Sequence, residues 1–306
     1  MHLFTRAVEL GSFSAVAREE SISQPTVSKM IAALERHLRV RLLERTTTSL
    51  TLTEDGKRFY ERSKRIIEEY ADAVTDARGQ THMFVGALRI NAPVGLGELR
   101  LNALILEFLA KYPEIEIELI LNDRVIDLVE EGVDVAIRLG GELPPNVIAR
   151  NIAFSPRVLV ATREYVERAP KINKPEDLAQ HEYFRFAGLA FGNRLEFSSY
   201  TGKVIVLTKG RLRVNSSLAL RECFLDGKGL GSAPAWLVQD LIDTGYLVRL
   251  LPNWEMMPQQ AHLVYPSRKY QPQRTRALLQ FMAERIPKLP GFYAPGQSEA
   301  VLTLPQ

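Results

Sequence analysis

Between residues 11 and 56, a short polar run separates two segments in which apolar residues recur every three or four positions. This spacing places apolar side chains on one helix face, so the stretch predicts two short helices that pack together. Ser23 can cap the second helix and Pro25 suits its first turn, so we expect this helix to begin near Gln24. The apolar positions are Phe13, Val16, Ala17 and Ile22 in the first helix, and Val27, Met30, Ile31, Leu34 and Leu38 in the second.

The first turns of the second helix carry polar side chains, which can donate hydrogen bonds to base edges or phosphates while Val27 and Ile31 face inward. Such a helix pair is typical of helix-turn-helix proteins that read DNA. The helix residues that we expect to contact DNA are Ser23, Gln24, Pro25, Thr26, Ser28 and Lys29.

Residues 40–53 place β-branched and apolar residues on both sides of a hydroxyl-rich turn. This pattern predicts a two-stranded ribbon, which would form a wing beside the helix pair. Its tip can contact the phosphate backbone or insert a cation into the minor groove. The wing residues expected at the DNA are Arg45, Thr46 and Thr48.

The charge distribution agrees with a DNA-binding N-terminus. The whole chain of 306 residues has a formal net charge of only +3, so a nucleic-acid binder of this composition must concentrate its cations. They do cluster in and just after the winged helix-turn-helix region, at Lys29, Arg36, Arg39, Arg41, Arg45, Lys57 and Arg58. The alternative is an ordinary solvated charged surface.

Several short motifs are similar to the N-terminal signature of LysR-type transcriptional regulators. They are Gly11-Ser12-Phe13-Ser14, Ser23-Gln24-Pro25, Val27-Ser28, Leu34-Glu35, Arg45-Thr46 and Leu52-Thr53-Glu54-Asp55-Gly56. Residues 90–96, 108–113 and 134–138 resemble the start of the family's effector-binding domain. The resemblance implies an α/β protein in which an all-α winged helix-turn-helix precedes a two-subdomain effector domain, similar to periplasmic binding proteins.

Two positions depart from the family pattern. Arg39 stands at the end of the second helix, where the family usually has a glycine because that position commonly adopts a left-handed conformation. Arg39 either costs some stability or adds a phosphate contact. The chain also opens abruptly at Met1, so the helix at the very start of the chain lacks its usual beginning.

Residues 54–80 contain no proline and repeat small or apolar side chains at steps of three and four, which is the seam of a long helix that packs against another helix. The residues expected at a dimer interface are Phe59, Ile66, Tyr70 and Ala73. The alternative is that the seam packs on its own chain. A dimer would place two recognition helices about 34 Å apart, which predicts an inverted-repeat operator.

After a hinge at residues 81–86, strands alternate with helices, which predicts a mostly parallel sheet covered on both faces. We expect strands at 88–92, 115–121 and 133–139, and helices at 98–112 and 124–131. By the resemblance, the chain divides into a DNA-binding domain (1–57), a linker helix (58–80) and an effector domain (87–287). Its first subdomain covers 87–161 and 266–287, and its second covers 162–265. Proline and glycine in residues 288–306 predict a flexible tail.

Ligands of open α/β sheets bind beyond the carboxyl ends of strands, where helix N-termini offer free N–H groups. The candidate effector residues at such positions are Pro93, Val94, Gly95, Leu96, Arg138, Leu139, Ser216 and Ser217. For each residue the alternative is a turn or a helix cap. Many family members have Ser or Thr near Pro93 and Val94, so backbone N–H groups would have to hold the ligand here. A small anion such as a carboxylate is the preferred effector.

We therefore predict a cytoplasmic regulator that binds double-stranded DNA as a homodimer or homotetramer, contacts RNA polymerase and responds to an unknown small molecule. The chain has no leader or membrane-spanning stretch, its five histidines lack metal spacing, and no catalytic motif occurs, so we expect no enzyme activity, cofactor or metal. Two alternatives stay open. The protein could be an architectural DNA binder with a vestigial pocket, or a solute-binding protein or enzyme of α/β type.

Overall fold

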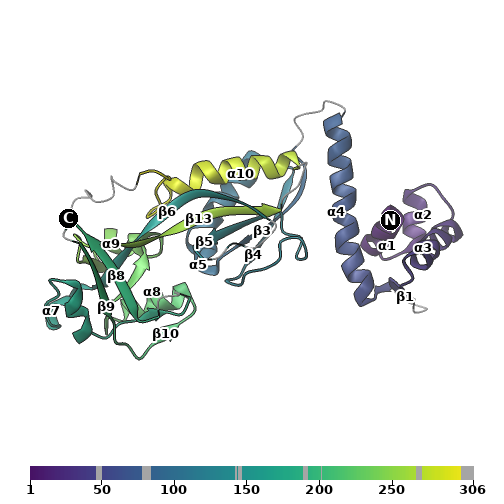
Figure 1. Cartoon of the computed structure of the whole chain (residues 1–306). Helices are drawn as coiled ribbons and strands as arrows, with labels where there is room; N and C mark the ends of the chain where they lie inside the picture. The colour runs from purple at the N-terminus through teal and green to yellow at the C-terminus, as the bar shows by residue number, and fades with distance from the viewer. Residues whose placement is uncertain are drawn as a thin grey trace. The chain divides into compact units, whose positions relative to one another are not determined.

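The computed structural model describes residues 1–45, 50–77, 84–141, 143, 147–188, 192–200, 202–266 and 271–297. The chain forms two compact units, Met1–Gly86 and Ala87–Gln306 (Figure 1). The predicted hinge falls mostly outside the described residues. Among the helices of these ranges, none combines the length and the apolar character needed to cross a membrane.

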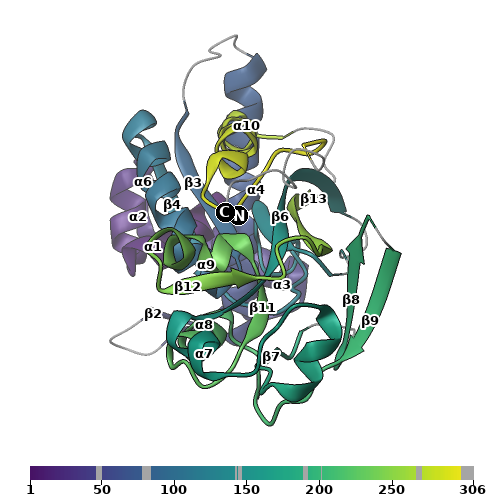
Figure 2. The ribbon, with the colours of Figure 1, turned by 90° about the vertical axis from the view of Figure 1, so that its left-hand side faces the viewer.

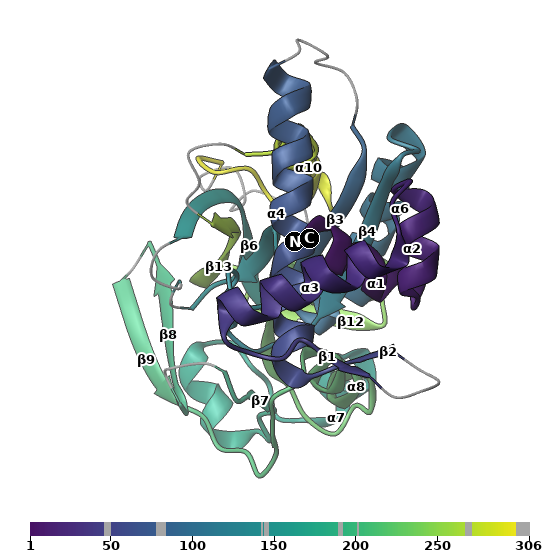
Figure 3. The same cartoon turned by 90° about the vertical axis from the view of Figure 1, so that its right-hand side faces the viewer.

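The first unit consists of three short helices, a two-stranded ribbon and one long helix. Its elements are α1 (His2–Leu10), α2 (Phe13–Glu19), α3 (Gln24–Leu38), β1 (Leu43–Arg45), β2 (Leu50–Leu52) and α4 (Glu54–Ala77). Figure 3 shows the helices of this unit. They enclose an apolar core that includes Phe4, Val16, Val27, Ile31 and Leu42. The predicted helix pair and ribbon are thus confirmed, except that Ile22 lies beyond the end of α2 and is exposed. The abrupt start does not prevent a first helix, because α1 forms from His2 onward and buries Phe4.

Among the described residues, seven strands form the central sheet of the second unit. Their order is β11-β6-β13-β5-β3-β4, and β12 also pairs with β6. The strands are β3 (Gly86–Ala92), β4 (Ile115–Leu121), β5 (Val135–Leu139), β6 (Val147–Thr162), β11 (Gly231–Pro234), β12 (Leu247–Leu250) and β13 (Met256–Pro266). Strands β3 and β5 are parallel, but β13 is antiparallel to β5 and β6, and β6 is antiparallel to β11 and β12. The prediction of a mostly parallel sheet is therefore wrong.

The sheet is mixed because the two long strands β6 and β13 run in opposite directions through the unit and connect two lobes (Figure 1). The first lobe contains β3, β4 and β5 with α5 (Val94–Leu96), the π-helical turn η1 (Gly97–Leu101), α6 (Asn102–Lys111) and α10 (Gln273–Arg285). The second lobe contains α7 (Arg163–Arg168), the 3-10 helix η2 (Pro175–Gln180), β7 (Arg185–Phe186), β8 (Arg194–Ser199), β9 (Gly202–Leu207), β10 (Arg213–Val214), α8 (Ser217–Leu225), β11, α9 (Ala235–Asp243) and β12.

In the first lobe, one predicted helix is extended and another is absent. Helical residues run without a break from Val94 to Lys111, so the helix expected from residue 98 begins at Val94. Residues 124–131 do not form the predicted helix. The carboxylate of Asp127 instead accepts hydrogen bonds from the N–H groups of Val129 (2.8 Å) and Glu130 (3.0 Å), which gives a local turn. The apolar residues of this segment, Ile126 and Leu128, are buried without a helix.

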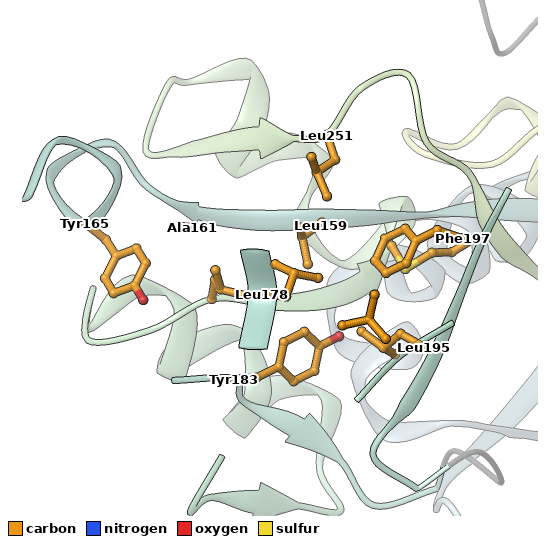
Figure 4. Close-up of a cluster of buried hydrophobic side chains, with 11 residues drawn as sticks. Leu159, Ala161, Tyr165, Leu178, Tyr183, Leu195, Phe197 and Leu251 are labelled. Atoms are coloured by element: carbon orange, nitrogen blue, oxygen red, sulfur yellow. The ribbon is translucent and has the colours of Figure 1, made fainter. Parts of the chain in front are cut away.

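The second lobe has its own apolar core. It lies between the end of β6 and the helices and short strands around it (Figure 4). Its buried members are Leu159, Ala161, Tyr165, Leu178, Tyr183, Leu195, Phe197, Val206, Leu230, Leu251 and Met256. Phe197 and Val206 come from the hairpin of β8 and β9, which lies at the side of this lobe (Figure 2).

The end of the chain packs on the second unit at least as far as Tyr293. The ring of Phe292 stacks on Trp236 with the two planes 8° apart, and Tyr293 exchanges backbone hydrogen bonds with Phe154. Gly291 adopts a positive φ of 76° against the backbone of α9. The prediction of a flexible tail from residue 288 is wrong for this segment, because Phe292 packs on α9 and Tyr293 packs on β6. Residues 298–306 of the predicted tail lie outside the described ranges.

Candidate DNA-contacting surface and effector site

Helix α3 begins where the sequence predicts. Ser23 is its N-cap, and its Oγ accepts a hydrogen bond from the N–H of Thr26 at 3.3 Å. The Oγ1 of Thr26 lies 2.8 Å from the Oγ of Ser23, so the two hydroxyls are paired. Pro25 lies in the first turn, as expected. The cap holds the polar end of α3 in one conformation, which is what a recognition surface needs.

The predicted DNA-contacting residues of α3 lie together on its outer side. Gln24, Pro25, Thr26 and Lys29 are exposed and Ser28 is half-buried, whereas Val27 and Ile31 are almost fully buried as predicted. Met30 is 53% exposed, although its spacing placed it on the apolar face. It follows Thr26 by four residues, so the two share one side of the helix. A methionine there can contact a thymine methyl group, and only its position at the edge of the apolar stripe hinted at this.

Helix α3 ends in the conformation expected from the family's glycine. Arg39 has φ 57° and ψ 27°, the left-handed region, and its N–H donates to the carbonyl of Arg36. Immediately afterwards, the carboxylate of Glu35 accepts hydrogen bonds from the N–H groups of Leu42 (2.8 Å) and Leu43 (3.1 Å). These bonds fix the direction in which the chain enters the wing.

The wing is a short antiparallel ribbon in which Leu43 pairs with Leu52 and Arg45 pairs with Leu50. Its predicted tip, with Thr46 and Thr48, lies outside the described residues, as does the side chain of Arg45. The pairing of β1 with β2 therefore fixes the residues on either side of the tip.

The predicted seam of α4 divides into two parts. Phe59 packs into the core of its own unit, with its ring centroid 5.6 Å from that of Phe4, which is the alternative that the sequence left open. Farther along, Ile66 is 51% exposed and Tyr70 is 72% exposed. The side chain of Ala73 lies outside the described set. An apolar surface on α4 thus begins beyond the part that packs on its own unit.

Two of the three predicted effector segments meet. Gly95 lies against the start of α8, so closely that a Cβ added to Gly95 would be 2.2 Å from the Oγ of Ser217. Ser216 caps α8 by accepting a hydrogen bond from the N–H of Ala219 at 3.3 Å.

Pro93 is the N-cap of α5, and the N–H of Val94 donates to the carboxylate of Asp123 at 3.2 Å. Leu96 is buried. Asp123 was not among the residues predicted from the sequence, although its position just beyond β4 was an available signal.

The third segment supplies a buried cation. Arg138 is only 8% exposed, and its Nε and Nη2 have no hydrogen-bond partner among the described residues. Burial lowers the pKa of Arg138 from its ordinary value, and the carboxylate of Asp123 opposes this shift. Because arginine stays protonated in proteins, this position holds a buried charge that a bound anion would stabilise, in addition to the charge of Asp123. Nε and Nη2 form the edge of the guanidinium that binds a carboxylate through two parallel hydrogen bonds.

The neighbours of Arg138 on the sheet are also polar. His262 of β13 is its partner in the ladder, so the two side chains lie on the same face. Burial lowers the pKa of His262, and its Nδ1 has no partner within the described ranges. The carbonyl of Leu139 accepts a hydrogen bond from Gln259 at 3.4 Å. His262 and Gln259 could not be predicted from the sequence, because strand pairing across more than a hundred residues brings them to this site.

Other chemistry is not assembled in the described part of the chain. No group of three His, Cys, Asp or Glu side chains there could hold a metal ion. Cys223 is half-buried, and burial raises the pKa of its thiol, which favours a packed side chain over a reactive thiolate.

Comparison with known proteins identifies both units. Residues 1–57 match the model of the bacterial regulatory helix-turn-helix protein, lysR family, and residues 82–287 match that of the LysR substrate binding domain. The transcriptional regulator PtxR of Pseudomonas aeruginosa is 31% identical over 95% of this chain and 93% of its own. The solved structure of CrgA, a LysR-type regulator of Neisseria meningitidis, is 29% identical with a TM-score of 0.61 over 93% of this chain and 97% of its own. The Vibrio cholerae virulence activator AphB is 28% identical with a TM-score of 0.59 over 92% and 97%.

Proposed function

This chain belongs to the LysR family of transcriptional regulators, and on that basis we propose which of its residues read DNA and which sense an effector. It is a DNA-binding regulator with an N-terminal helix-turn-helix and a C-terminal effector-binding domain. The observation that supports the DNA contacts is the capped first turn of α3, where Gln24, Thr26 and Lys29 are exposed above the buried Val27. Since its relatives are regulators, we propose no enzyme activity.

In this proposal, α3 enters the major groove and the wing contacts the flanking backbone. The contact residues are Ser23, Gln24, Pro25, Thr26, Ser28 and Lys29 of the helix region, with Arg45, Thr46 and Thr48 of the wing. Ser23 acts mainly through its cap. The domain limits set out above, with a linker helix at 58–80, belong to the same proposal.

Replacing Thr26 or Ser28 with alanine is expected to change base preference, whereas Arg45→Ala is expected to weaken binding to all sequences alike. A lost base contact costs roughly 1–3 kcal/mol at one position of the site. A lost phosphate contact lowers the slope of log affinity against log salt by about 0.9. Selection from a randomised duplex pool and a salt titration measure the two effects. A uniform loss of affinity in all three variants would remove Thr26 and Ser28 from the recognition surface.

We propose that α4 joins two chains through Ile66, Tyr70 and Ala73. The support is the exposure of Ile66 and Tyr70 on a long helix, which cannot bury such a surface alone. Phe59 is left out, because it already packs in its own unit. A dimer of this kind fits an inverted-repeat operator, and pairs of dimers would give a tetramer. We place the protein in the cytoplasm, where an effector would alter its DNA contacts and its contact with RNA polymerase.

We propose that the effector is a small carboxylate held by Arg138 near the segments 93–96 and 216–217. The support is the free guanidinium edge, buried and without a partner among the described residues. Val94, Gly95 and Ser217 would form the walls of this site. Effector binding would favour one of two arrangements of the DNA-binding pairs through differential affinity for the two.

Among small carboxylates screened by thermal shift, we expect a stabilising compound whose primary amide analogue has no effect. Arg138→Lys should weaken its binding about 10- to 150-fold, since a charge-assisted hydrogen bond contributes about 1.5–3 kcal/mol and lysine lacks the planar fork. Isothermal titration calorimetry measures the affinity, and DNA footprinting reports the response. Arg249→Lys, a conservative change in β12, is the control. Equal stabilisation by acid and amide would contradict the anion site.

A further inference from the structure

One carboxylate joins the two lobes of the second unit. Asp240 lies on α9 of the second lobe and accepts a hydrogen bond from the Nη2 of Arg100, in η1 of the first lobe, at 2.9 Å. The Nε of Arg100 also donates to the carbonyl of Trp236 at 3.1 Å. Arg100 is therefore bound to α9 at two points, although it lies 140 residues before Asp240 in the chain.

The same carboxylate binds an arginine of its own lobe. Arg221 of α8 donates from Nη1 to Oδ1 of Asp240 at 2.9 Å and forms a second bond from Nη2 to Oδ2. The side chains of Arg100 and Arg221 are 13% and 12% exposed. Two largely buried guanidinium groups thus share one negative charge. Without Asp240, Arg100 and Arg221 would keep their bonds to the carbonyls of Trp236 and Leu237 but lose their shared counter-charge. Two like charges without a counter-charge are costly in a partly buried position.

Helix α9 is a fixed anchor for this cluster. The backbone N–H of Trp236 donates to the Oγ of Ser155 on β6 at 3.1 Å, and its indole N–H donates to Gln259 on β13 at 2.9 Å. Both long strands therefore hold α9. On the other side, Arg100 lies in a π-helical turn, a local widening that alters the direction of side chains from a helix. The cluster therefore connects α9, which β6 and β13 hold, with the helical run that follows β3.

Near this cluster, the lobes also touch at the predicted effector segments. The contact of Gly95 with Ser217 leaves no room for even a methyl group between α5 and α8. Any ligand between these two segments would require them to separate. Since Gly95 and Arg100 lie in one continuous helical run, such a separation would pull on the bonds from Arg100 to α9.

We propose that Arg100, Asp240 and Arg221 form an inter-lobe latch. The latch holds the first lobe closed on α8 and α9 and sets the free energy needed to separate the two lobes. Its bearing on ligand entry rests on the proposed effector site, but the latch itself is a property of the ligand-free chain. Asp240 is the central member, because it binds both cations, and Arg100 carries the link between the lobes. Arg221 strengthens the latch only within the second lobe.

Hydrogen exchange of the full-length, ligand-free protein tests the latch. In Asp240→Asn and Arg100→Gln, amide exchange in residues 94–101 and 216–222 is expected to rise at least about tenfold. In Arg221→Gln, which keeps the link from Arg100 to Asp240, it should stay within about twofold of wild type. Lys203→Gln, which breaks the exposed pair with Glu196, is the surface control. Exchange in α6 and α10 reports global unfolding and should not change.

Unchanged exchange in Arg100→Gln would overturn the latch, as would an equal rise in Arg221→Gln. If Asp240→Asn proves unstable, the comparison of the two arginine variants still decides the question. Arg138→Lys separates this proposal from the effector site. That variant should lose carboxylate binding while exchange in residues 94–101 stays at the wild-type level, so either proposal can fail without the other.

Discussion

Replacing Gly56 with alanine is expected to unfold the first unit and abolish DNA binding. A Cβ at Gly56 would lie 1.9 Å from the backbone oxygen of Leu42 and 2.8 Å from its carbonyl carbon. The backbone cannot move away easily, because that oxygen accepts a hydrogen bond from the N–H of Thr53, whose Oγ1 in turn binds Arg41 and Gly56. The loss should exceed the roughly 1–3 kcal/mol that overpacking usually costs. Urea denaturation and fluorescence anisotropy with duplex DNA measure the two effects.

Gly11→Ala is the matched control in the same unit. Gly11 has a positive φ of 62°, but no atom lies within 4 Å of an added Cβ. Its alanine variant should therefore lose only the roughly 1–2 kcal/mol that a left-handed conformation costs. If the two variants unfolded at the same urea concentration, steric contact with Leu42 would not be the reason for glycine at position 56.

Replacing Phe4 with alanine is expected to remove about 3–5 kcal/mol of stability from the first unit. Phe4 is fully buried, and its ring contacts Phe59, so it joins α1 to α4. A loss of this size is a large part of the roughly 5–15 kcal/mol that stabilises a typical domain. Urea denaturation followed by circular dichroism measures it, and DNA affinity should fall with the folded fraction.

Leu10→Ala, at the other end of α1, is the control for Phe4→Ala. Leu10 is 38% exposed, so its removal should change stability little. Phe4→Leu keeps part of the apolar volume and should fall between the two. An equal loss in Phe4→Ala and Leu10→Ala would contradict a role of Phe4 in the core of this unit.

The first unit could be predicted from the sequence because its signals are local. The cap at Ser23, the proline beside it and the spacing of Val27 and Ile31 all act within one or two helical turns. The left-handed conformation of Arg39 could be predicted from the family's usual glycine. Met30 was misplaced, because apolar spacing does not say where the buried stripe ends.

The second unit was harder to predict because its sheet depends on distant pairings. The antiparallel pairing of β6 with β13 joins residues about a hundred positions apart, and no local pattern encodes its direction. Residues 124–131 have helical spacing, but the carboxylate of Asp127 competes for the backbone N–H groups that a helix would use.

The candidate effector site likewise combines residues with local sequence signals and residues that only distant pairings bring together. Arg138 and the segment 93–96 could be named because they follow strands. Their partners could not, because Asp123, His262 and Gln259 reach the site only through the fold. Ser216 was predicted as an effector residue, but its hydroxyl caps α8, so a cap-forming residue at such a position already has a structural role.

The central place of β13 also bears on how the protein is made. This strand lies between β5 and β6, yet the ribosome completes it only after the whole second lobe. Until then, two strands of a growing chain have unpaired edges, which are open to aggregation and to capture by chaperones. Helix α10, which contacts α6 through Phe281 and Phe108, is synthesised later still. The first lobe therefore cannot complete its part of the sheet until the second lobe and β13 have been synthesised.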